Sequence, residues 1–134
     1  MDAKQLVRDS IETVWGQRSI DDIDRFLAAD FVDHSAPPGA AAGPAGFADG
    51  VRRIFAAFPD AHNAIDEIIA EGDFVVVRWT MTGTHAGDDL GFPATGRAIR
   101  LTGITMSRIA HGRIAEHWSY RDDLSMLRQL GLMP

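Results

Sequence analysis

In the N-terminal half of the chain, hydrophobic positions recur at the spacing of amphipathic helices. A first helix is predicted over residues 4–15, and Gly16 ends it. A short second helix is predicted over residues 22–29, and a third helix closes at Pro59. The apolar positions that define the first and third of these helices are Leu6, Ile11, Val14, Trp15, Phe47, Val51, Ile54, Phe55 and Phe58.

From residue 62 onward the pattern changes to that of strands. Four antiparallel strands are predicted, because turn sequences such as Glu71-Gly72-Asp73 and His111-Gly112 separate β-branched and aromatic runs. Before them, residues 31–34 are brief and extended, and a loop rich in proline and glycine follows. The strands are predicted over residues 64–70, 74–85, 97–109 and 113–121.

Helices followed by strands favour the α+β class. We expect one domain over residues 1–134, in which a cone-shaped, curved antiparallel sheet wraps around the N-terminal helices. A sheet of this shape leaves a concave, mostly apolar pocket at one end, which suits a small apolar molecule. We also expect a homodimer formed through the outer face of the sheet.

Composition and charge narrow the choice of partners. The net charge is −6 and no cluster of Lys or Arg is present, which disfavours nucleic-acid binding. The absence of cysteine excludes disulfides and thiolate chemistry. No pair among the five histidines has metal-ligand spacing, so no metal site is expected. Without an apolar leader or a membrane-length apolar run, a cytoplasmic location and no membrane partner are expected.

A carboxylate ends the last predicted strand, in the stretch E-H-W-S-Y-R-D-D-L-S-M-L. Because side chains alternate between the faces of a strand, Asp122 is expected beside Trp118 and Tyr120, with His117 on the opposite face. Desolvation by two aromatic rings would raise the pKa of such a carboxylate and suit it to proton transfer. The alternative is that Asp122 caps the final helix, a role that Asp123 fits equally well.

The same stretch resembles a known family. The C-terminal stretch is similar to the ending of the SnoaL-like polyketide cyclases, in the nuclear transport factor 2-like superfamily. That family ends in G-[KR]-I-x-[ED]-x-W-x-x-x-D, followed by a short helix with L-x-Q-L-G. The matching residues of this chain are G-R-I-A-E-H-W-S-Y-R-D and then D-L-S-M-L-R-Q-L-G. G-T-H-A-G-D-D-L-G-F-P-A-T-G-R resembles the family's G-T-H-x-G-x-x-x-G-x-P-P-T-G-R, and F-V-D-H-S followed by G-P-A-G-F looks like its entry to the third helix. The similarity covers nearly the whole chain in a consistent order.

The resemblance implies a barrel of the nuclear transport factor 2-like type and places Asp122 where the cyclases have their catalytic acid/base. In that family the carboxylate removes a proton from an ester-bearing carbon and starts an intramolecular aldol closure, without a metal or cofactor. A histidine on the preceding strand assists in the cyclases, and Thr105 stands near its place in this chain. This is a departure from the family pattern, because threonine donates a hydrogen bond but carries no positive charge.

Other side chains have both a functional and a structural interpretation. His34 could shuttle a proton at the pocket mouth, since histidine titrates near neutrality, or it could bond loop backbone. Arg78 could anchor an anionic or carbonyl substrate, or it could lie on the outer side of the sheet. His85 is interpreted as holding the loop that follows it. The candidate substrate-binding residues, of which the apolar ones could equally be core, are Phe31, Phe58, Arg78, Trp79, Thr105, Met106, Trp118 and Tyr120.

The leading hypothesis is a cofactor-free cyclase, lyase or isomerase that acts on a small apolar carbonyl or ester compound, with Asp122 and His34 as catalytic residues. An epoxide or ester hydrolase is the second hypothesis; it requires a carboxylate–Arg–carboxylate arrangement, of which Arg78 and Asp122 would supply two members. The third is a binding protein that keeps the pocket without the chemistry.

Overall fold

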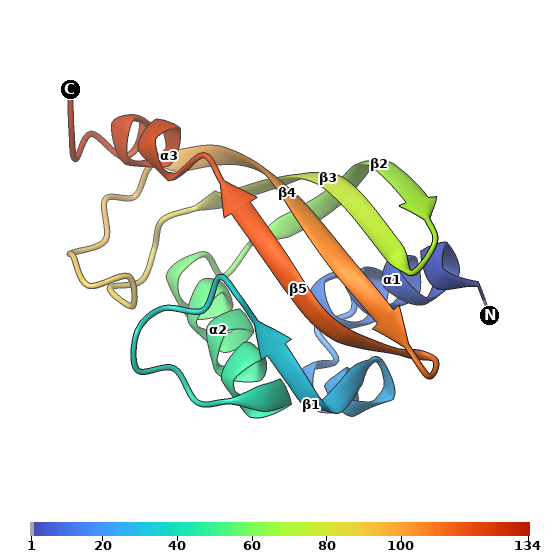
Figure 1. Cartoon of the computed structure of the whole chain (residues 1–134). Coiled ribbons are helices and arrows are strands. Elements are labelled where there is room, and N and C mark those ends of the chain that lie inside the picture. The colour runs from blue at the N-terminus through green and yellow to red at the C-terminus, as the bar shows by residue number, and fades with distance from the viewer. Residues whose placement is uncertain (1) are drawn as a thin grey trace.

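The computed structural model describes residues 2–134 and consists of a five-stranded sheet and several helices (Figure 1). The helices are α1 (Ala3–Ile11), which continues into a π-helical turn (Glu12–Gly16), a 3-10 helix (Ile20–Arg25), α2 (Gly43–Ala57) and α3 (Asp123–Gln129). The strands are β1 (Leu27–Asp33), β2 (His62–Glu71), β3 (Phe74–Thr84), β4 (Ala98–Ala110) and β5 (Arg113–Arg121).

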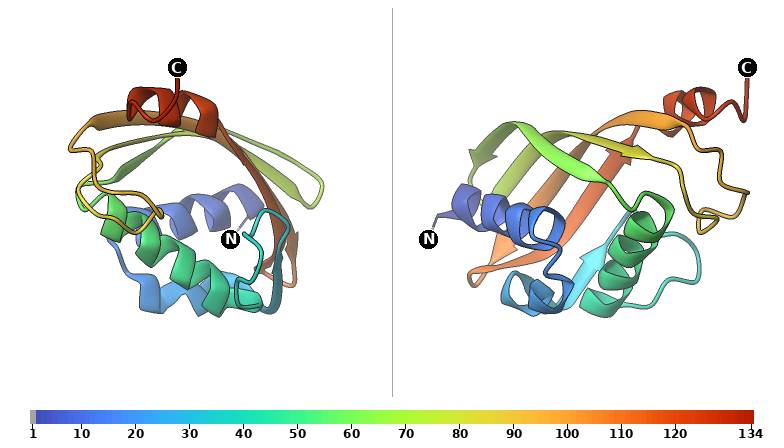
Figure 2. Two further views of the ribbon diagram at one scale, coloured as in Figure 1. Left: turned by 90° about the vertical axis from the view of Figure 1, so that its left-hand side faces the viewer. Right: turned by 180° about the vertical axis from the view of Figure 1, so that it is seen from behind.

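The strand order is β1-β5-β4-β3-β2. Pairs from β2 to β5 are antiparallel, and β1 runs parallel to β5. The sheet arches over α1 and α2, while α3 lies at the opposite end of the sheet from α1 (Figure 2). The prediction of an α+β fold with a curved sheet wrapped around the N-terminal helices is confirmed.

Two predicted elements differ from the structure near the N-terminus. The helix predicted over residues 22–29 is a 3-10 helix that ends at Arg25, and Ala28 and Ala29 belong to β1. The short extended segment is therefore a fifth strand, and its partner β5 lies far away in the sequence. Local periodicity does not reveal such a pairing, because the contacts that hold β1 are made with a distant strand.

The inner face of the sheet carries the core. Inward residues of β3 and β4 alternate with outward ones, and directly paired residues share a face. One buried cluster joins α1 and α2 to Val75 and Val77, and a second surrounds Phe58 and Met81 toward α3. Trp79 packs against both clusters and so stands between them on the inner face.

A bulge in β5 decides which of its side chains face the core. Arg108 pairs with Glu116 and Ile109 pairs with Ile114, so Ala115 has no partner across the ladder. Beyond this extra residue the alternation is reversed. His117 therefore faces inward, with Ser119 and Arg121 at the following inward positions, whereas Trp118 and Tyr120 face outward. The prediction that Trp118 and Tyr120 face the pocket and His117 the opposite side is wrong for this reason.

Two structural features are absent from residues 2–134. None of the helices there is both long and apolar enough to cross a membrane. No three or more His, Asp or Glu side chains in the same range gather in an arrangement that could hold a metal ion.

Candidate functional site

A groove of about 210 Å³ opens between α2, the inner face of β3 and β4, the loop after β3, and α3. Its lining is apolar except for Arg121 and Asp123, which match the few polar groups expected in a small-molecule site. The loop between β3 and β4 supplies two of the wall residues, Leu90 and Phe92. The lining residues are Ile54, Phe58, Met81, Leu90, Phe92, Leu101, Arg121, Asp123, Met126 and Leu127.

Asp122 stands between the two polar lining residues, where β5 passes into α3. Its side chain is exposed, and Oδ1 accepts a hydrogen bond of 3.1 Å from the backbone N–H of Ser125, which makes Asp122 the N-cap of α3. Asp123, the other candidate for the cap, is the first residue of the helix, and its Oδ1 lies 3.4 Å from Nε of Arg121. The capping interpretation of Asp122 is confirmed, and proton transfer by the same carboxylate stays a prediction.

Trp79 and Thr105 come together on the inner face beside this groove. Nε1 of Trp79 donates to Oγ1 of Thr105 at 3.0 Å, and that oxygen lies 2.9 Å from Oγ of Ser119. The position next to Thr105 along the inner face of β4 is Gly103, which pairs with Arg121 of the groove. Trp79, Thr105 and Ser119 thus form a hydrogen-bonded row on the inner face, next to the Gly103–Arg121 pair.

An ion pair further along the inner face was not predicted from the sequence. Nε2 of His117 lies 3.0 Å from Oδ1 of Asp33, and the His117 ring packs edge-on against Phe31 and Phe47. Burial acts to raise the pKa of Asp33, but the hydrogen bond and positive charge of His117, with the Ser35 backbone N–H, outweigh it and leave this pKa lowered. Phe31, predicted as a pocket wall, is a core residue here.

His34 lies on the outer face rather than at the mouth of the groove. Its ring stacks on Trp118 at 4.5 Å between centroids, and Nε2 lies 2.7 Å from Oε2 of Glu116. Glu116 also accepts from Nε of Arg108 at 2.6 Å. These bonds, with Arg108 contributing most and His34 next, lower the pKa of Glu116. Met106, which pairs with Trp118, shares this outer face.

Arg78 also lies on the outer face, where its backbone pairs with that of Ile104. Its Nε donates to Oε1 of Glu67 at 2.7 Å, and Nη1 is 3.7 Å from Oδ2 of Asp66. The structure therefore groups Arg78 with two carboxylates, as an epoxide hydrolase would require, but Asp122 is not one of them and the group does not line the groove. Arg78, Met106, Trp118 and Tyr120 are thus placed away from the groove by their strand faces.

His85 holds the loop that follows it, as predicted. Its Nδ1 accepts from the Thr95 backbone N–H at 3.1 Å and lies 3.0 Å from Oγ1 of Thr95. The His85 backbone N–H donates to the carbonyl of Arg97, and its carbonyl accepts from Gly96. The loop between β3 and β4 is closed at its base by these bonds.

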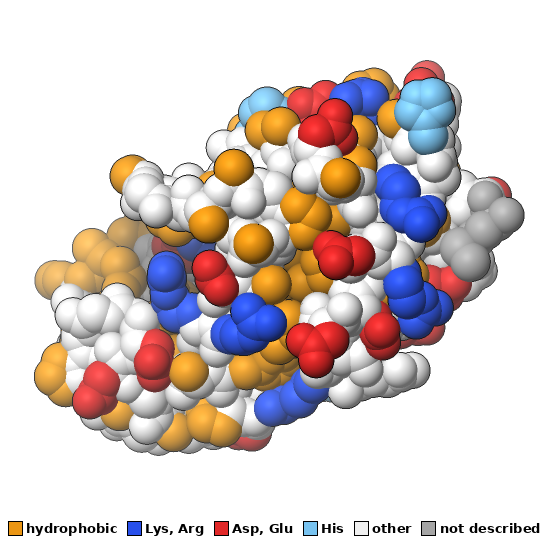
Figure 3. Space-filling model, turned by 90° about the horizontal axis from the view of Figure 1, so that it is seen from below, with side chains coloured by type: hydrophobic (Ala, Val, Ile, Leu, Met, Phe, Trp, Pro, Cys, Tyr) orange, Lys and Arg blue, Asp and Glu red, His pale blue; other side chains and the backbone are white. Residues whose placement is uncertain are grey.

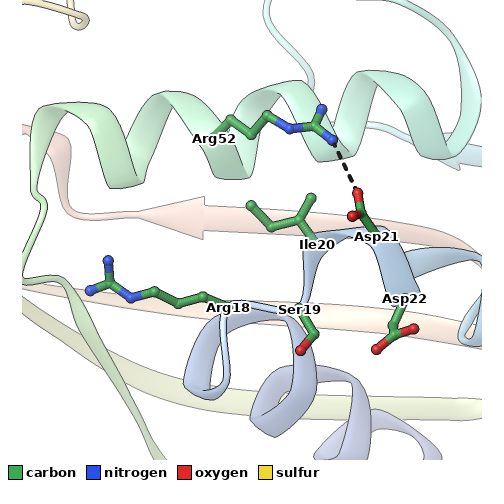
Figure 4. A pocket seen from close by; sticks show the side chains of 6 residues that line it. All are labelled: Arg18, Ser19, Ile20, Asp21, Asp22 and Arg52. Carbon is green, nitrogen blue, oxygen red and sulfur yellow. Dashed lines mark ion pairs between the residues drawn. The ribbon is translucent and has the colours of Figure 1, made fainter.

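A second, polar cleft of about 420 Å³ lies beside the 3-10 helix (Figure 4). In Figure 4 Arg52 of α2 points toward Asp21, with 3.9 Å between Nη2 and Oδ1. Seen from below, acidic and basic side chains are interspersed around hydrophobic ones, and no large patch of one sign covers that face (Figure 3). None of the predicted site residues lines this cleft, whose lining is Arg18, Ser19, Ile20, Asp21, Asp22 and Arg52.

Comparisons with known proteins agree with the fold and the sequence motifs. The family model described as SnoaL-like polyketide cyclase matches residues 5–130. Aklanonic acid methyl ester cyclase DnrD of Streptomyces peucetius is 32% identical over 133 residues, which cover 94% of this chain and 88% of that protein. Aklanonic acid methyl ester cyclase DauD of a Streptomyces species is 33% identical over 135 residues, with coverage of 94% and 80%.

Solved structures also resemble this chain in fold. TsrD from Streptomyces laurentii superposes with a TM-score of 0.88 at 28% identity, over 99% of both chains. A SnoaL-like polyketide cyclase from Agrobacterium tumefaciens superposes with a TM-score of 0.81 over 98% of this chain and 100% of its own. Its identity of 18% makes it a likeness of fold alone.

Proposed function

Because the chain belongs to the SnoaL-like polyketide cyclase family, we propose that it catalyses a cofactor-free, intramolecular aldol-type ring closure on a largely apolar carbonyl substrate that bears an ester. The names of two relatives, both aklanonic acid methyl ester cyclases, support an ester of this kind. The observation that carries the proposal is the apolar groove, whose charged lining residues Arg121 and Asp123 flank Asp122.

The proposed reaction balances without any co-reactant. A carboxylate removes a proton from the carbon next to the ester carbonyl, and the resulting enolate carbon attacks a ketone carbon of the same molecule. A carbon–carbon bond forms, and the ketone oxygen becomes an alkoxide that takes the proton back from the carboxylic acid. Substrate and product therefore have the same mass, and one acid/base group with a hydrogen-bond donor for the developing oxyanion suffices.

Asp122 is the proposed acid/base. The capping bond uses Oδ1, and Oδ2 makes no hydrogen bond to any residue in 2–134, so it is available to a substrate at the rim of the groove. At about 210 Å³ the groove accommodates part of a multi-ring substrate, since pockets for drug-sized ligands measure about 300–1,000 Å³. The reacting ester and ketone would occupy the rim near Asp122, with the apolar rings toward Phe58 and Met81.

The test uses aklanonic acid methyl ester with the wild type and two variants, Asp122→Asn and Asp123→Asn. Chromatographic separation of two compounds of equal mass measures ring closure. We expect Asp122→Asn to lower kcat by about 100-fold or more, which is the usual contribution of general acid/base catalysis. Asp123→Asn, one residue away and also at the groove, should retain most of the rate. Equal rates for Asp122→Asn and the wild type would remove Asp122 from the mechanism.

A wild type that binds the ester without closing its ring would favour the binding-protein alternative instead. Hydrolysis of the ester would favour the hydrolase alternative; it adds water and releases methanol, so the acid that remains is lighter than the ester by the mass of one methylene group.

We also propose that two copies pair through the outer face of the sheet. Large hydrophobic side chains are exposed on this face, with Tyr120 at 72%, Ile69 at 63% and Ile104 at 47% exposure. The same face on a second copy offers a matching apolar surface, as a two-fold interface requires. A cytoplasmic location stays a prediction, which cell fractionation tests.

A further inference from the structure

Two buried side-chain atoms lack a hydrogen-bond partner within the described part of the chain, Oδ1 of Asn63 and Nε2 of His85. The His85 side chain is fully buried, with 0% exposure. Buried polar atoms are nearly always paired in folded proteins, so an unpaired one needs a physical explanation. His85 is the more informative of the two, because its hydrogen bonds show which ring nitrogen carries the proton.

The hydrogen bonds at Nδ1 identify the unpaired atom as a donor. The Thr95 backbone N–H points at Nδ1 from 3.1 Å, and Oγ1 of Thr95 accepts from the Arg97 backbone N–H while lying 3.0 Å from Nδ1. A ring nitrogen that accepts these bonds carries no proton, so the neutral imidazole bears its proton on Nε2. An N–H group is therefore buried without an acceptor.

This N–H group belongs to a ring that packs against the wall of the groove. The His85 ring lies 5.5 Å from the ring of Phe58 and 5.3 Å from that of Phe92, measured between centroids. Both aromatic residues line the groove. The backbone bonds of His85 to Arg97 and Gly96, of 2.9 and 2.8 Å, fix the residue in place. Phe92 is only half-buried and lies on the loop, and donation from Nε2 to a molecule in the groove requires its side chain to turn aside.

We propose that Nε2–H of His85 donates a hydrogen bond to a carbonyl oxygen of the substrate in this groove. The inference rests on the proposed function and adds to it a donor for a substrate carbonyl at the Phe58 end of the groove, away from the reacting groups at the rim. A neutral imidazole donates without a carboxylate partner, which agrees with its position between two phenyl rings. Thr105, the residue that stands near the family's assisting histidine, is already bonded to Trp79 and Ser119 on the inner face. His85 supplies a donor from a different element, the loop after β3.

Nuclear magnetic resonance on the full chain, labelled with ¹⁵N and with ¹³C at the methionine methyl groups, tests this directly. Long-range ¹H–¹⁵N spectra should show the ring of His85 protonated at Nε2 alone. Two probes are then titrated, methyl benzoylacetate, which is a β-keto ester, and butylbenzene, which has the ring but no oxygen. Both should shift the methyl signals of Met81 and Met126 in the groove. Only methyl benzoylacetate should move the Nε2–H proton downfield.

Three results would overturn the inference. One is a ring protonated at Nδ1. Another is binding of methyl benzoylacetate, seen at Met81 and Met126, with the Nε2–H signal unmoved; the N–H would then be satisfied by the face of a phenyl ring. The third is an absence of any shift at the groove methyls with either probe, which would also remove the groove as the substrate site.

Variants give a second measurement. His85→Phe removes the donor and should weaken binding of methyl benzoylacetate by about 3- to 10-fold while leaving that of butylbenzene unchanged. His85→Gln keeps an N–H near the position of Nε2 and should restore part of the affinity, and the exposed His62→Gln is the control. An equal loss for both probes would indicate a structural role alone. Where His85→Phe does not fold, the wild-type spectra decide.

Failure of this inference and failure of the proposed function are distinguishable. Asp122→Asn should leave the Nε2–H shift with methyl benzoylacetate intact and still lower the rate of ring closure by about 100-fold or more. A protein that closes the ring while its Nε2–H never responds would keep the proposed function and lose only the role of His85.

Discussion

Nε2 of His117 lies 3.0 Å from Oδ1 of Asp33, across the parallel pair formed by β5 and β1. The pair is largely shielded from solvent, with His117 at 9% exposure and the rings of Phe31 and Phe47 against the imidazole. It ties β1 to the rest of the sheet on the side where the helices pack. The bulge at Ala115 makes the contact geometrically feasible, because it turns His117 inward.

Asp33→Asn should destabilise the fold in a manner that depends on pH. Because the pKa of Asp33 is lowered in the folded state, its stabilisation is complete above the ordinary pKa of an aspartate. It is lost as the pH falls from that value through the lowered pKa. We expect the variant to lose roughly 1–3 kcal/mol of unfolding free energy at pH 7. Urea unfolding at a series of pH values measures the difference, which should shrink in acid.

Asp30→Asn, on the same strand but exposed, is the matched control and should change stability by less than about 0.5 kcal/mol. A difference between wild type and Asp33→Asn that stays constant as the pH falls would mean that the charge of Asp33 does not stabilise the fold.

Hydrophobic periodicity predicted the class of fold and the strands from β2 to β5, because apolar and polar residues alternate locally along these strands. It did not predict β1, since Ala28 and Ala29 favour a helix locally and only the pairing with β5 holds them extended. Nor could it predict the bulge at Ala115, because one extra residue leaves no mark in composition yet reverses every later side chain of β5.

The same limit applies to the candidate site. Phe58 lines the groove, and Trp79 and Thr105 face the interior, while their contact with a substrate stays a prediction. Arg78 and Met106 are one residue away from Trp79 and Thr105 and face outward. Strand alternation alone does not predict which of these two pairs faces inward. Both faces of β3 and β4 carry apolar residues, and the sequence does not indicate which face the helices cover.

Gly103→Ala should destabilise the protein through Trp79. A methyl group at position 103 would overlap the indole ring, which must then move away from Thr105. Overpacking of this kind costs about 1–3 kcal/mol. Gly50→Ala in α2 is the control, because a methyl group there meets no atom within 4 Å and should stabilise the helix by up to about 1 kcal/mol. Denaturant unfolding of both variants measures the contrast, and equal effects would exclude the steric argument.

Tyr120→Asp should convert the proposed dimer into a monomer. Tyr120 is 72% exposed on the outer face and pairs with Ile104, so a dimer through this face would bury the new charge in an apolar surface. Light scattering coupled to size-exclusion chromatography measures the mass. Leu132→Asp, an exposed apolar residue after α3, is the control and should leave the dimer intact. A wild type that is monomeric at high concentration would refute the interface itself.

Asp122 has two separable roles, and a pair of variants distinguishes them. Asn accepts the same bond from the Ser125 N–H, so Asp122→Asn should lose less than about 1 kcal/mol, mainly the interaction of the charge with the helix dipole. Asp122→Ala removes the cap and should lose about 0.5–2 kcal/mol. Urea unfolding gives these values, and ring closure is measured on the same samples. If both variants lose the rate and only Ala lowers stability markedly, the carboxylate transfers protons as well as capping α3. If the rate instead follows stability, high in Asn and low in Ala, then Asp122 is a cap alone and the base of the reaction is another carboxylate.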